Sequence, residues 1–154
     1  MVVIAILAIL ASMAAPSFRS IIERWQVKST TESLISSIYL ARTEAMKRGG
    51  GVQLARSCST VGWECGWVIR IPDPDDTSKF ITLRTIEAQR NVTIKLNNAS
   101  ASSMTYDRQG RASSLGLGAF SFTIQTQGTT SDAVRTICMS TAGRLSEVKD
   151  SKCS

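Results

Sequence analysis

Four cysteines are the residues of this 154-residue chain whose type and spacing most directly suggest chemistry. They form two pairs that are close in sequence, Cys58 with Cys65 and Cys138 with Cys153. Neither spacing is the C-x-x-C of a zinc knuckle or a redox motif, so we expect two disulfides formed in an oxidising compartment. Four cysteines allow three pairings, of which pairing between sequence neighbours needs the least rearrangement. Free thiols in the cytosol are the alternative.

No set of residues suggests catalysis. The chain has no histidine, which excludes Ser-His-Asp and Cys-His chemistry and most zinc sites. Asp73, Asp75 and Asp76 lack the glycine and distal glutamate of a calcium-binding EF-hand loop, and the two prolines among them favour an exposed hairpin loop. Trp63 and Trp67 are expected to pack over the first cysteine pair rather than to stack on bases. We therefore predict a protein that is not an enzyme and binds no metal or cofactor.

Positive charge is the second chemical feature. Eighteen Lys and Arg against twelve Asp and Glu give a net charge of +6, scattered along the chain. An ordinary solvated surface is one interpretation, and contact with nucleic acid or an anionic membrane is the other. The most constrained basic segment is the loop that a Cys138–Cys153 disulfide would close. It carries Arg144, Lys149 and Lys152, which we predict to contact DNA phosphates without reading base sequence.

The first fifteen residues, MVVIAILAILASMAA, carry no charge. A secretory signal peptide would have basic residues before this apolar run, but the first basic residue is Arg19. A transmembrane helix needs about 20 apolar residues, and Phe18, Ile21 and Ile22 extend this shorter run. A buried core helix is the third reading. We interpret the segment as a membrane helix, and we expect that its beginning is missing from the sequence.

A helical pattern follows this apolar run. Apolar residues recur at spacings of three and four, namely Leu34, Ile35, Ile38, Ala41, Ala45 and Met46. Pro16 lacks an N–H and should kink the helix, and Gly49, Gly50 and Gly51 should end it. A helix from residue 1 to 48 would be roughly 70 Å long, too long for a small head to cover. Its front half must therefore be buried in a membrane or against other copies.

Beyond Gly51 the apolar period changes to two, as expected for strands with one buried face. Six segments show it: 52–54, 67–71, 80–84, 92–96, 120–124 and 134–139. They predict an antiparallel sheet covered by the amphipathic half of the helix, an α+β fold. We divide the chain into an apolar helix segment 1–18, an amphipathic helix 19–48, and a sheet domain 49–154 that ends in the disulfide-closed loop.

Several motifs resemble those of one protein family. They are Ala41-Arg42-Thr43-Glu44-Ala45-Met46-Lys47-Arg48-Gly49, Cys65-Gly66-Trp67-Val68, Tyr106-Asp107-Arg108-Gln109-Gly110-Arg111, and Thr136-Ile137-Cys138-Met139-Ser140 with Gly143-Arg144. With them the whole chain resembles the GspH/FimT family of type IV pilin-like proteins. The resemblance implies a long helix on an antiparallel sheet, anchorage as a single-pass protein of the bacterial inner membrane with a periplasmic head, and packing with other pilins through the helix.

The resemblance leaves the machine open. Some family members resemble type IV pilus subunits of the FimT and FimU kind, others pseudopilin H of type II secretion, and one branch serves DNA uptake. That branch carries Gly-Arg-x-Arg, where this chain has Gly143-Arg144-Leu145-Ser146. Family precursors begin with a basic leader and a Gly-Phe-Thr-Leu-Ile-Glu motif, cleaved and methylated by a prepilin peptidase, that this sequence lacks. The two cysteine pairs and the basic charge favour the pilus branch.

Overall fold

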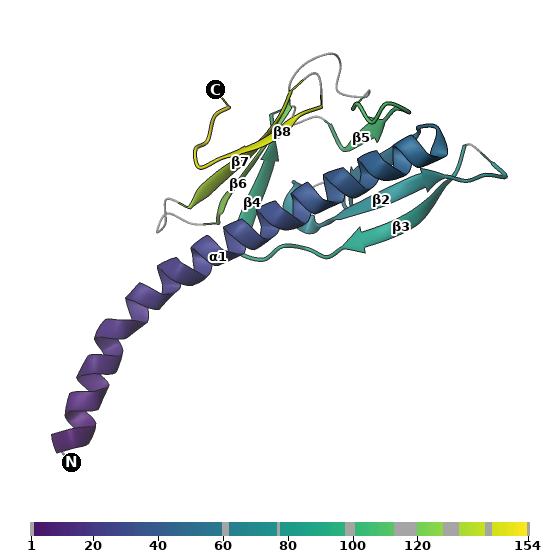
Figure 1. Ribbon diagram of the computed structural model, residues 1–154. Helices are drawn as coiled ribbons and strands as arrows, with labels where there is room; N and C mark the ends of the chain where they lie inside the picture. The colour runs from purple at the N-terminus through teal and green to yellow at the C-terminus, as the bar shows by residue number, and fades with distance from the viewer. Residues whose placement is uncertain are drawn as a thin grey trace.

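The structure is a computed structural model of the 154-residue chain. It describes residues 2–59, 62–76, 78–97, 101–112, 120–127, 133–140 and 143–153, with helix side chains at residue 3 and from residue 18 onward. Helix α1 (Val2–Arg48) is continuous, which confirms the predicted single helix. Its N-terminal part projects away from the head and curves (Figure 1). The kink predicted at Pro16 falls on a side chain outside the described residues and stays a prediction.

The C-terminal half of α1 buries one face. Val27, Leu34, Ile38, Ala41 and Ala45 follow one another at spacings of seven, four, three and four residues, and each is at most 1% exposed. These spacings place all five side chains on one side of a helix with 3.6 residues per turn. This buried face covers the β-structure of the head, as the sequence predicted for the amphipathic half of the helix.

One residue of the apolar series predicted for this helix, Met46, is not part of the buried face. Met46 is 49% exposed, because it lies 100° around the helix from buried Ala45. The glycines that follow take positive φ angles of 82°, 104° and 79°, and the Gly50 N–H donates to the Ala45 carbonyl at 2.8 Å. Lys47 and Arg48 both pair with Glu44 in the last turns. The helix thus ends where the sequence predicted.

Eight strands in the described parts of the chain form two antiparallel sheets of four strands each. The first has the order β3-β2-β1-β5, with bounds Phe80–Ile86, Trp67–Pro72, Val52–Arg56 and Ser103–Tyr106. The second has the order β4-β6-β7-β8, with bounds Val92–Leu96, Phe120–Thr126, Val134–Met139 and Leu145–Val148. The six predicted segments are all strands, but β3, at the edge of the first sheet, lacks the predicted buried face, because its residues 80–85 are all exposed. The division into two sheets and the edge strands β5 and β8 were not predicted.

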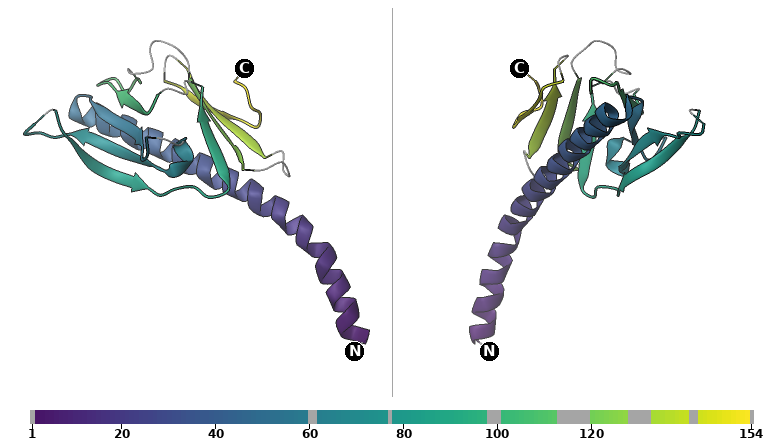
Figure 2. Two further views of the ribbon diagram at one scale, coloured as in Figure 1. Left: turned by 180° about the vertical axis from the view of Figure 1, so that it is seen from behind. Right: turned by 45° about the vertical axis from the view of Figure 1, so that its right-hand side comes forward.

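The helix packs between the two sheets, in contact with β1 and β5 of the first and with β6 and β7 of the second (Figure 2). The two tryptophans fill the junction. The Trp67 indole is fully buried, and its Nε1–H donates to the Ser37 hydroxyl of α1 at 2.9 Å. Trp63 lies in the short 3-10 helix η1 (Trp63–Cys65), with its ring edge-on to Phe122 of β6 at 5.0 Å. Both are core side chains, and their predicted packing over the first cysteine pair stays a prediction.

The aspartate cluster lies in the hairpin between β2 and β3, as predicted. The Asp75 N–H donates to Asp73 Oδ1 at 2.9 Å, and Lys79 pairs with Asp76 at 3.0 Å. The side-chain oxygens of Asp73 and Asp76 therefore stabilise the turn itself. No group of metal-binding side chains gathers there or elsewhere in the described part of the chain.

Candidate interaction surfaces

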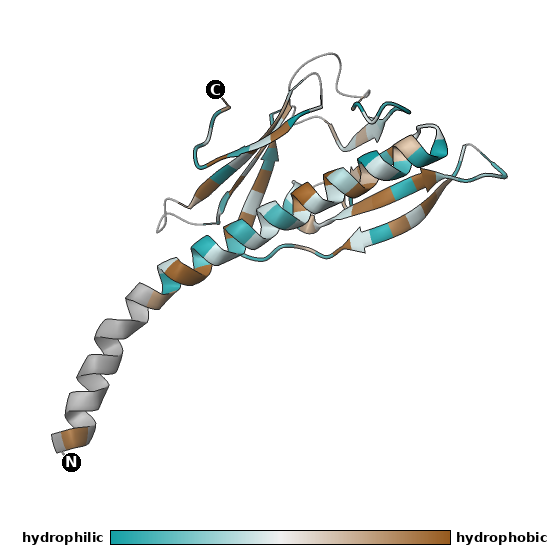
Figure 3. Cartoon of the chain, in the orientation of Figure 1, coloured by the Kyte–Doolittle hydropathy of each residue, from teal (hydrophilic) through white to brown (hydrophobic). Residues whose placement is uncertain are grey.

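Helix α1 carries an apolar stripe where it leaves the head. Its members are Phe18, Ile21, Ile22 and Trp25, each between 53% and 67% exposed. They stand at positions i, i+3, i+4 and i+7, so they share one face of the helix. Buried Val27 follows Trp25 by two residues, a rotation of about 200°, so Trp25 faces away from the head. Phe18 and Ile22 stand at the edge of the head, where they line a shallow pocket with Asn91, Thr126 and Gln127. Figure 3 shows the apolar band at this level of the helix.

The predicted membrane segment, residues 1–18, lies almost entirely outside the described side chains. Among the helical residues whose side chains are described, no stretch is both long and apolar enough to cross a bilayer. For the stripe from Phe18 to Trp25, in contrast, the structure gives the exposure of each apolar side chain.

Two disulfides join the four cysteines, Cys58 with Cys65 and Cys138 with Cys153. The Cα–Cα distances are 6.3 Å and 5.8 Å, within the range of ordinary disulfides. This is the pairing of sequence neighbours. The first closes the connection from β1 into η1, and the second ties the tail after β8 to strand β7.

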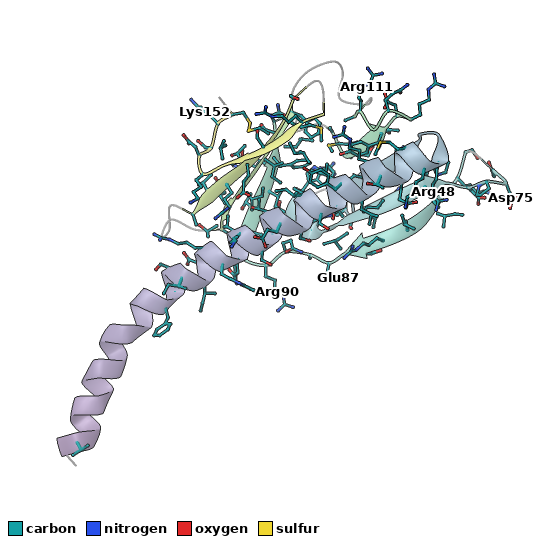
Figure 4. The ribbon with its side chains drawn as sticks, viewed as in Figure 1. Arg48, Asp75, Glu87, Arg90, Arg111 and Lys152 are labelled. Carbon is teal, nitrogen blue, oxygen red and sulfur yellow. A yellow bond between two sulfur atoms is a disulfide. The ribbon has the colours of Figure 1, made fainter. Side chains whose placement is uncertain are left out.

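The segment between Cys138 and Cys153 is a strand hairpin rather than the predicted loop. Residues Leu145–Val148 form β8, which pairs with β7 from Met139 to Thr136. Arg144 and Lys149 flank this strand, so an extended chain separates their Cα atoms by roughly 16 Å. Lys152 lies in the tail beyond (Figure 4). The structure therefore does not gather Arg144, Lys149 and Lys152 into one patch.

Arg42 joins two turns that belong to different sheets. From α1 its Nη1 donates to the Gly143 carbonyl, in the turn between β7 and β8, at 2.6 Å. A Cβ on Gly143 would lie 3.2 Å from Arg42 Nη2, and one on Gly110, in the turn after β5, would lie 2.7 Å from Arg42 Cγ. Both glycines have positive φ, 81° and 72°. Glycine at these positions lets both turns lie against the arginine.

Tyr106 completes this junction from β5. Its side chain is fully buried, and its hydroxyl has no hydrogen-bond partner among the described residues. Burial raises the pKa of Tyr106, and the nearby Arg42 charge opposes this only in part. The sequence pointed to these motifs as family features but gave no sign that they meet, because their contact depends on the packing of two sheets.

The junction also brings arginines together on a side of the head away from the point where the helix emerges (Figure 4). Arg144 follows Gly143, and Arg108 and Arg111 flank Gly110, so all three stand on the two turns that meet at Arg42. Arg108 and Arg144 are exposed and make no ion pair within the described residues, whereas Arg111 pairs with Asp107 at 3.1 Å. Figure 4 shows Arg111 on this side, away from Arg90. Arg144 thus groups with residues that the sequence did not associate with it.

Comparison with known proteins gives one family and one fold. The model of the protein family described as "Type II transport protein GspH" matches residues 30–143 of this chain. Two crystal forms of the type IV minor pilin FimU of Pseudomonas aeruginosa strain PAO1 are similar in structure. One has a TM-score of 0.65 and 23% identity over 80% of this chain and 89% of that chain. The other has a TM-score of 0.64 and 21% identity, and the match covers 79% of this chain and 91% of that chain. A search of curated proteins found no match.

Proposed function

Because this chain belongs to the GspH family of type II transport proteins, we propose that it is a minor pilin-like structural subunit of a type IV filament machine. The apolar stripe of Phe18, Ile21, Ile22 and Trp25 is the observation that carries this proposal. Apolar residues at i, i+3, i+4 and i+7 are the pattern by which a helix packs against a partner. Covering these half-exposed side chains would contribute roughly 4–7 kcal/mol, which a filament of packed helices supplies.

The same helix serves two environments in turn. Before assembly it anchors the chain in the bacterial inner membrane as a single-pass protein, with the head in the periplasm. After assembly it packs against the helices of other pilins in the filament core. The two disulfides are consistent with an oxidising compartment such as the periplasm. A prepilin peptidase processes and methylates the full-length precursor, and the chain itself performs no catalysis.

Two machines use such subunits. The fold shared with the minor pilin FimU favours type IV pilus assembly, whereas the family description favours the type II secretion pseudopilin H. The likeness to FimU extends over about four fifths of this chain, so we propose the pilus and keep the secretion pseudopilin as the alternative. The identity of the neighbouring subunit distinguishes them.

The test is photo-crosslinking in the membranes of producing cells. The photoreactive amino acid p-benzoylphenylalanine is placed at Trp25 and, as a control, at Phe80, which is exposed at the start of β3. We expect position 25, and not position 80, to form an adduct with the N-terminal helix of another pilin-like protein, identified by mass spectrometry. Pilus subunits in the adduct support the first machine and pseudopilins the second. If neither position formed an adduct with the helix of another pilin-like protein, the proposal would be rejected.

Contact with DNA is a second candidate function. It is favoured by the three arginines of the two turns that meet at Arg42, namely Arg108, Arg111 and Arg144. The full chain in detergent is titrated with duplex DNA at several salt concentrations, where the log–log slope should be near −0.9 per phosphate contacted. Arg108→Gln/Arg144→Gln should weaken binding and flatten this slope, and Lys149→Gln/Lys152→Gln should change neither. Equal effects of the two pairs would remove these two turns from consideration.

A further inference from the structure

A basic hollow opens beside α1 at the edge of the head from which the helix emerges. Its volume is about 260 Å³. Helix α1 and the β7–β8 hairpin, which are far apart in sequence, line it together with basic and apolar side chains: Arg24, Val27, Ala133, Val134, Arg135 and Lys149. The convergence of three basic residues from α1, β7 and the end of β8 distinguishes it from a run of charge on one exposed face.

The charge of this hollow is only partly compensated. Arg135 pairs with Glu147 of the neighbouring strand β8. Arg24 and Lys149 are exposed and have no acidic partner within the described part of the chain. Two positive groups without an acidic partner therefore line the hollow together with the apolar side chains of Val27 and Val134. This arrangement suits an anion attached to an apolar body.

The position of the hollow along the axis of α1 indicates which kind of anion would bind there. Arg24 follows Phe18, the first residue of the stripe, by six residues, a rise of about 9 Å. The headgroup region extends roughly 5–7 Å beyond the hydrocarbon core on each side of a bilayer, and Arg and Lys side chains reach toward it. Trp25 stands beside Arg24, and tryptophan favours this interface. With Phe18 at the edge of the hydrocarbon, the hollow lies at the level of the lipid phosphates.

We propose that the hollow formed by Arg24, Arg135 and Lys149 binds the phosphate of an anionic lipid headgroup while the subunit is held in the membrane. This inference rests on the proposed membrane-anchored function. The start of β7 lies beside α1 where the helix leaves the head (Figure 1), and Val134 and Arg135 at that start line the hollow. A phosphate of the bilayer therefore reaches the hollow directly, whereas duplex DNA would have to pass between head and membrane. Such a contact orients the head on the bilayer and must be released when the subunit enters a filament.

The full chain is reconstituted into vesicles of phosphatidylcholine alone or of equal parts phosphatidylcholine and phosphatidylglycerol. A water-soluble acylating reagent then modifies accessible lysines, and peptide mapping measures the rate at each one. Labelling of Lys149 should fall about five-fold in the anionic vesicles, the factor expected for one basic residue near an anionic surface. Lys79, in the hairpin between β2 and β3 at the other end of the head, is the internal control. Arg24→Gln should restore much of the Lys149 labelling, and the matched variant Arg108→Gln should not.

Several results would overturn the assignment. Equal labelling of Lys149 in both vesicles removes the headgroup site, and equal protection of Lys79 shows only a general attraction of a basic protein. Protection of Lys149 by duplex DNA but not by phosphatidylglycerol assigns the hollow to a polynucleotide instead. Flotation separates this failure from that of the proposed function. A chain that floats with neither vesicle contradicts membrane anchorage and this site with it, whereas flotation with both and unchanged labelling rejects the headgroup site alone.

Discussion

The Arg42 guanidinium is the contact point of three segments that are distant in sequence. It reaches from α1 to the Gly143 carbonyl and lies against Gly110, so one side chain fixes the turn after β5 and the turn before β8. A hydrogen bond from a charged donor contributes about 1.5–3 kcal/mol, more than a neutral one. The Arg42 contact therefore has a larger effect on stability than the surface ion pairs farther along the same helix.

The glycine at 110 tests this contact. Gly110 and Gly49 have similar positive φ angles, 72° and 82°, but only the Cβ of an alanine at 110 would meet Arg42, because nothing lies within 4 Å at 49. Gly49→Ala should lower the free energy of unfolding by about 1–2 kcal/mol through backbone strain alone. Gly110→Ala should cost about 1.5–3 kcal/mol more, because Arg42 must move from its hydrogen bond. Urea unfolding measures both, and in an Arg42→Ala background the two alanine variants should cost the same.

Tyr106 predicts a dependence of stability on alkaline pH. Because its folded-state pKa lies above the ordinary value of about 10, the folded chain holds the phenolic proton where the unfolded chain releases it. The contribution is therefore present in full below pH 10 and is lost as the pH rises above it. Tyr106→Phe removes a hydroxyl without a hydrogen-bond partner in the described structure, so it should be neutral or stabilising at pH 7 and should flatten the alkaline loss. Tyr39→Phe, at an exposed position, is the control. An unchanged alkaline slope in Tyr106→Phe would contradict this account.

Regular elements with a strong apolar period were readable in the sequence, and short edge strands were not. The face of α1 and the six alternating segments were predicted because apolar residues recur in each at a fixed spacing, although β3 leaves its apolar residues exposed. Strand β8 has only four residues, Ser146 and Glu147 are exposed, and it is held by pairing with β7 and by the Cys138–Cys153 bond. Its formation depends on contacts outside its own sequence, and so does the separation of Arg144 from Lys149. For the same reason the hollow at Arg24 and the junction at Arg42 could not be predicted.

The two disulfides should contribute unequally to the elements that they hold. Cys138–Cys153 closes a separation of 15 residues and Cys58–Cys65 one of 7. In the chain-entropy description these bridges stabilise the fold by about 3.0 and 2.4 kcal/mol. Unfolding of Cys138→Ala/Cys153→Ala and Cys58→Ala/Cys65→Ala under identical conditions tests the order. The Cys138→Ala/Cys153→Ala variant should also show faster amide hydrogen exchange in β8. Non-reducing peptide maps that link Cys58 to Cys138 or Cys153 would overturn the pairing itself.

At the scale of the whole molecule, two regions of the surface differ in chemistry. The helix leaves the head with an apolar stripe and a basic hollow beside it, and a side of the head away from that point presents the turns that carry Arg108 and Arg144. This polarity fits a subunit that stands on a membrane and later enters a filament with its helix inward. The head itself is closed around a single core between the sheets, so the stripe, rather than the core, is where assembly acts.

The most direct measurement is the amount of the chain in filaments sheared from producing cells, compared with the amount left in the membrane. Ile22→Asp/Trp25→Asp places charge on the stripe without touching the buried face of α1, and Phe80→Asp alters an exposed aromatic on the head as the control. The account predicts that the stripe variant folds, forms both disulfides and remains in the membrane fraction but is missing from filaments, while Phe80→Asp is incorporated like the unaltered chain. Incorporation of the stripe variant at the unaltered level would contradict the claim that this helix face joins the subunit to its neighbours.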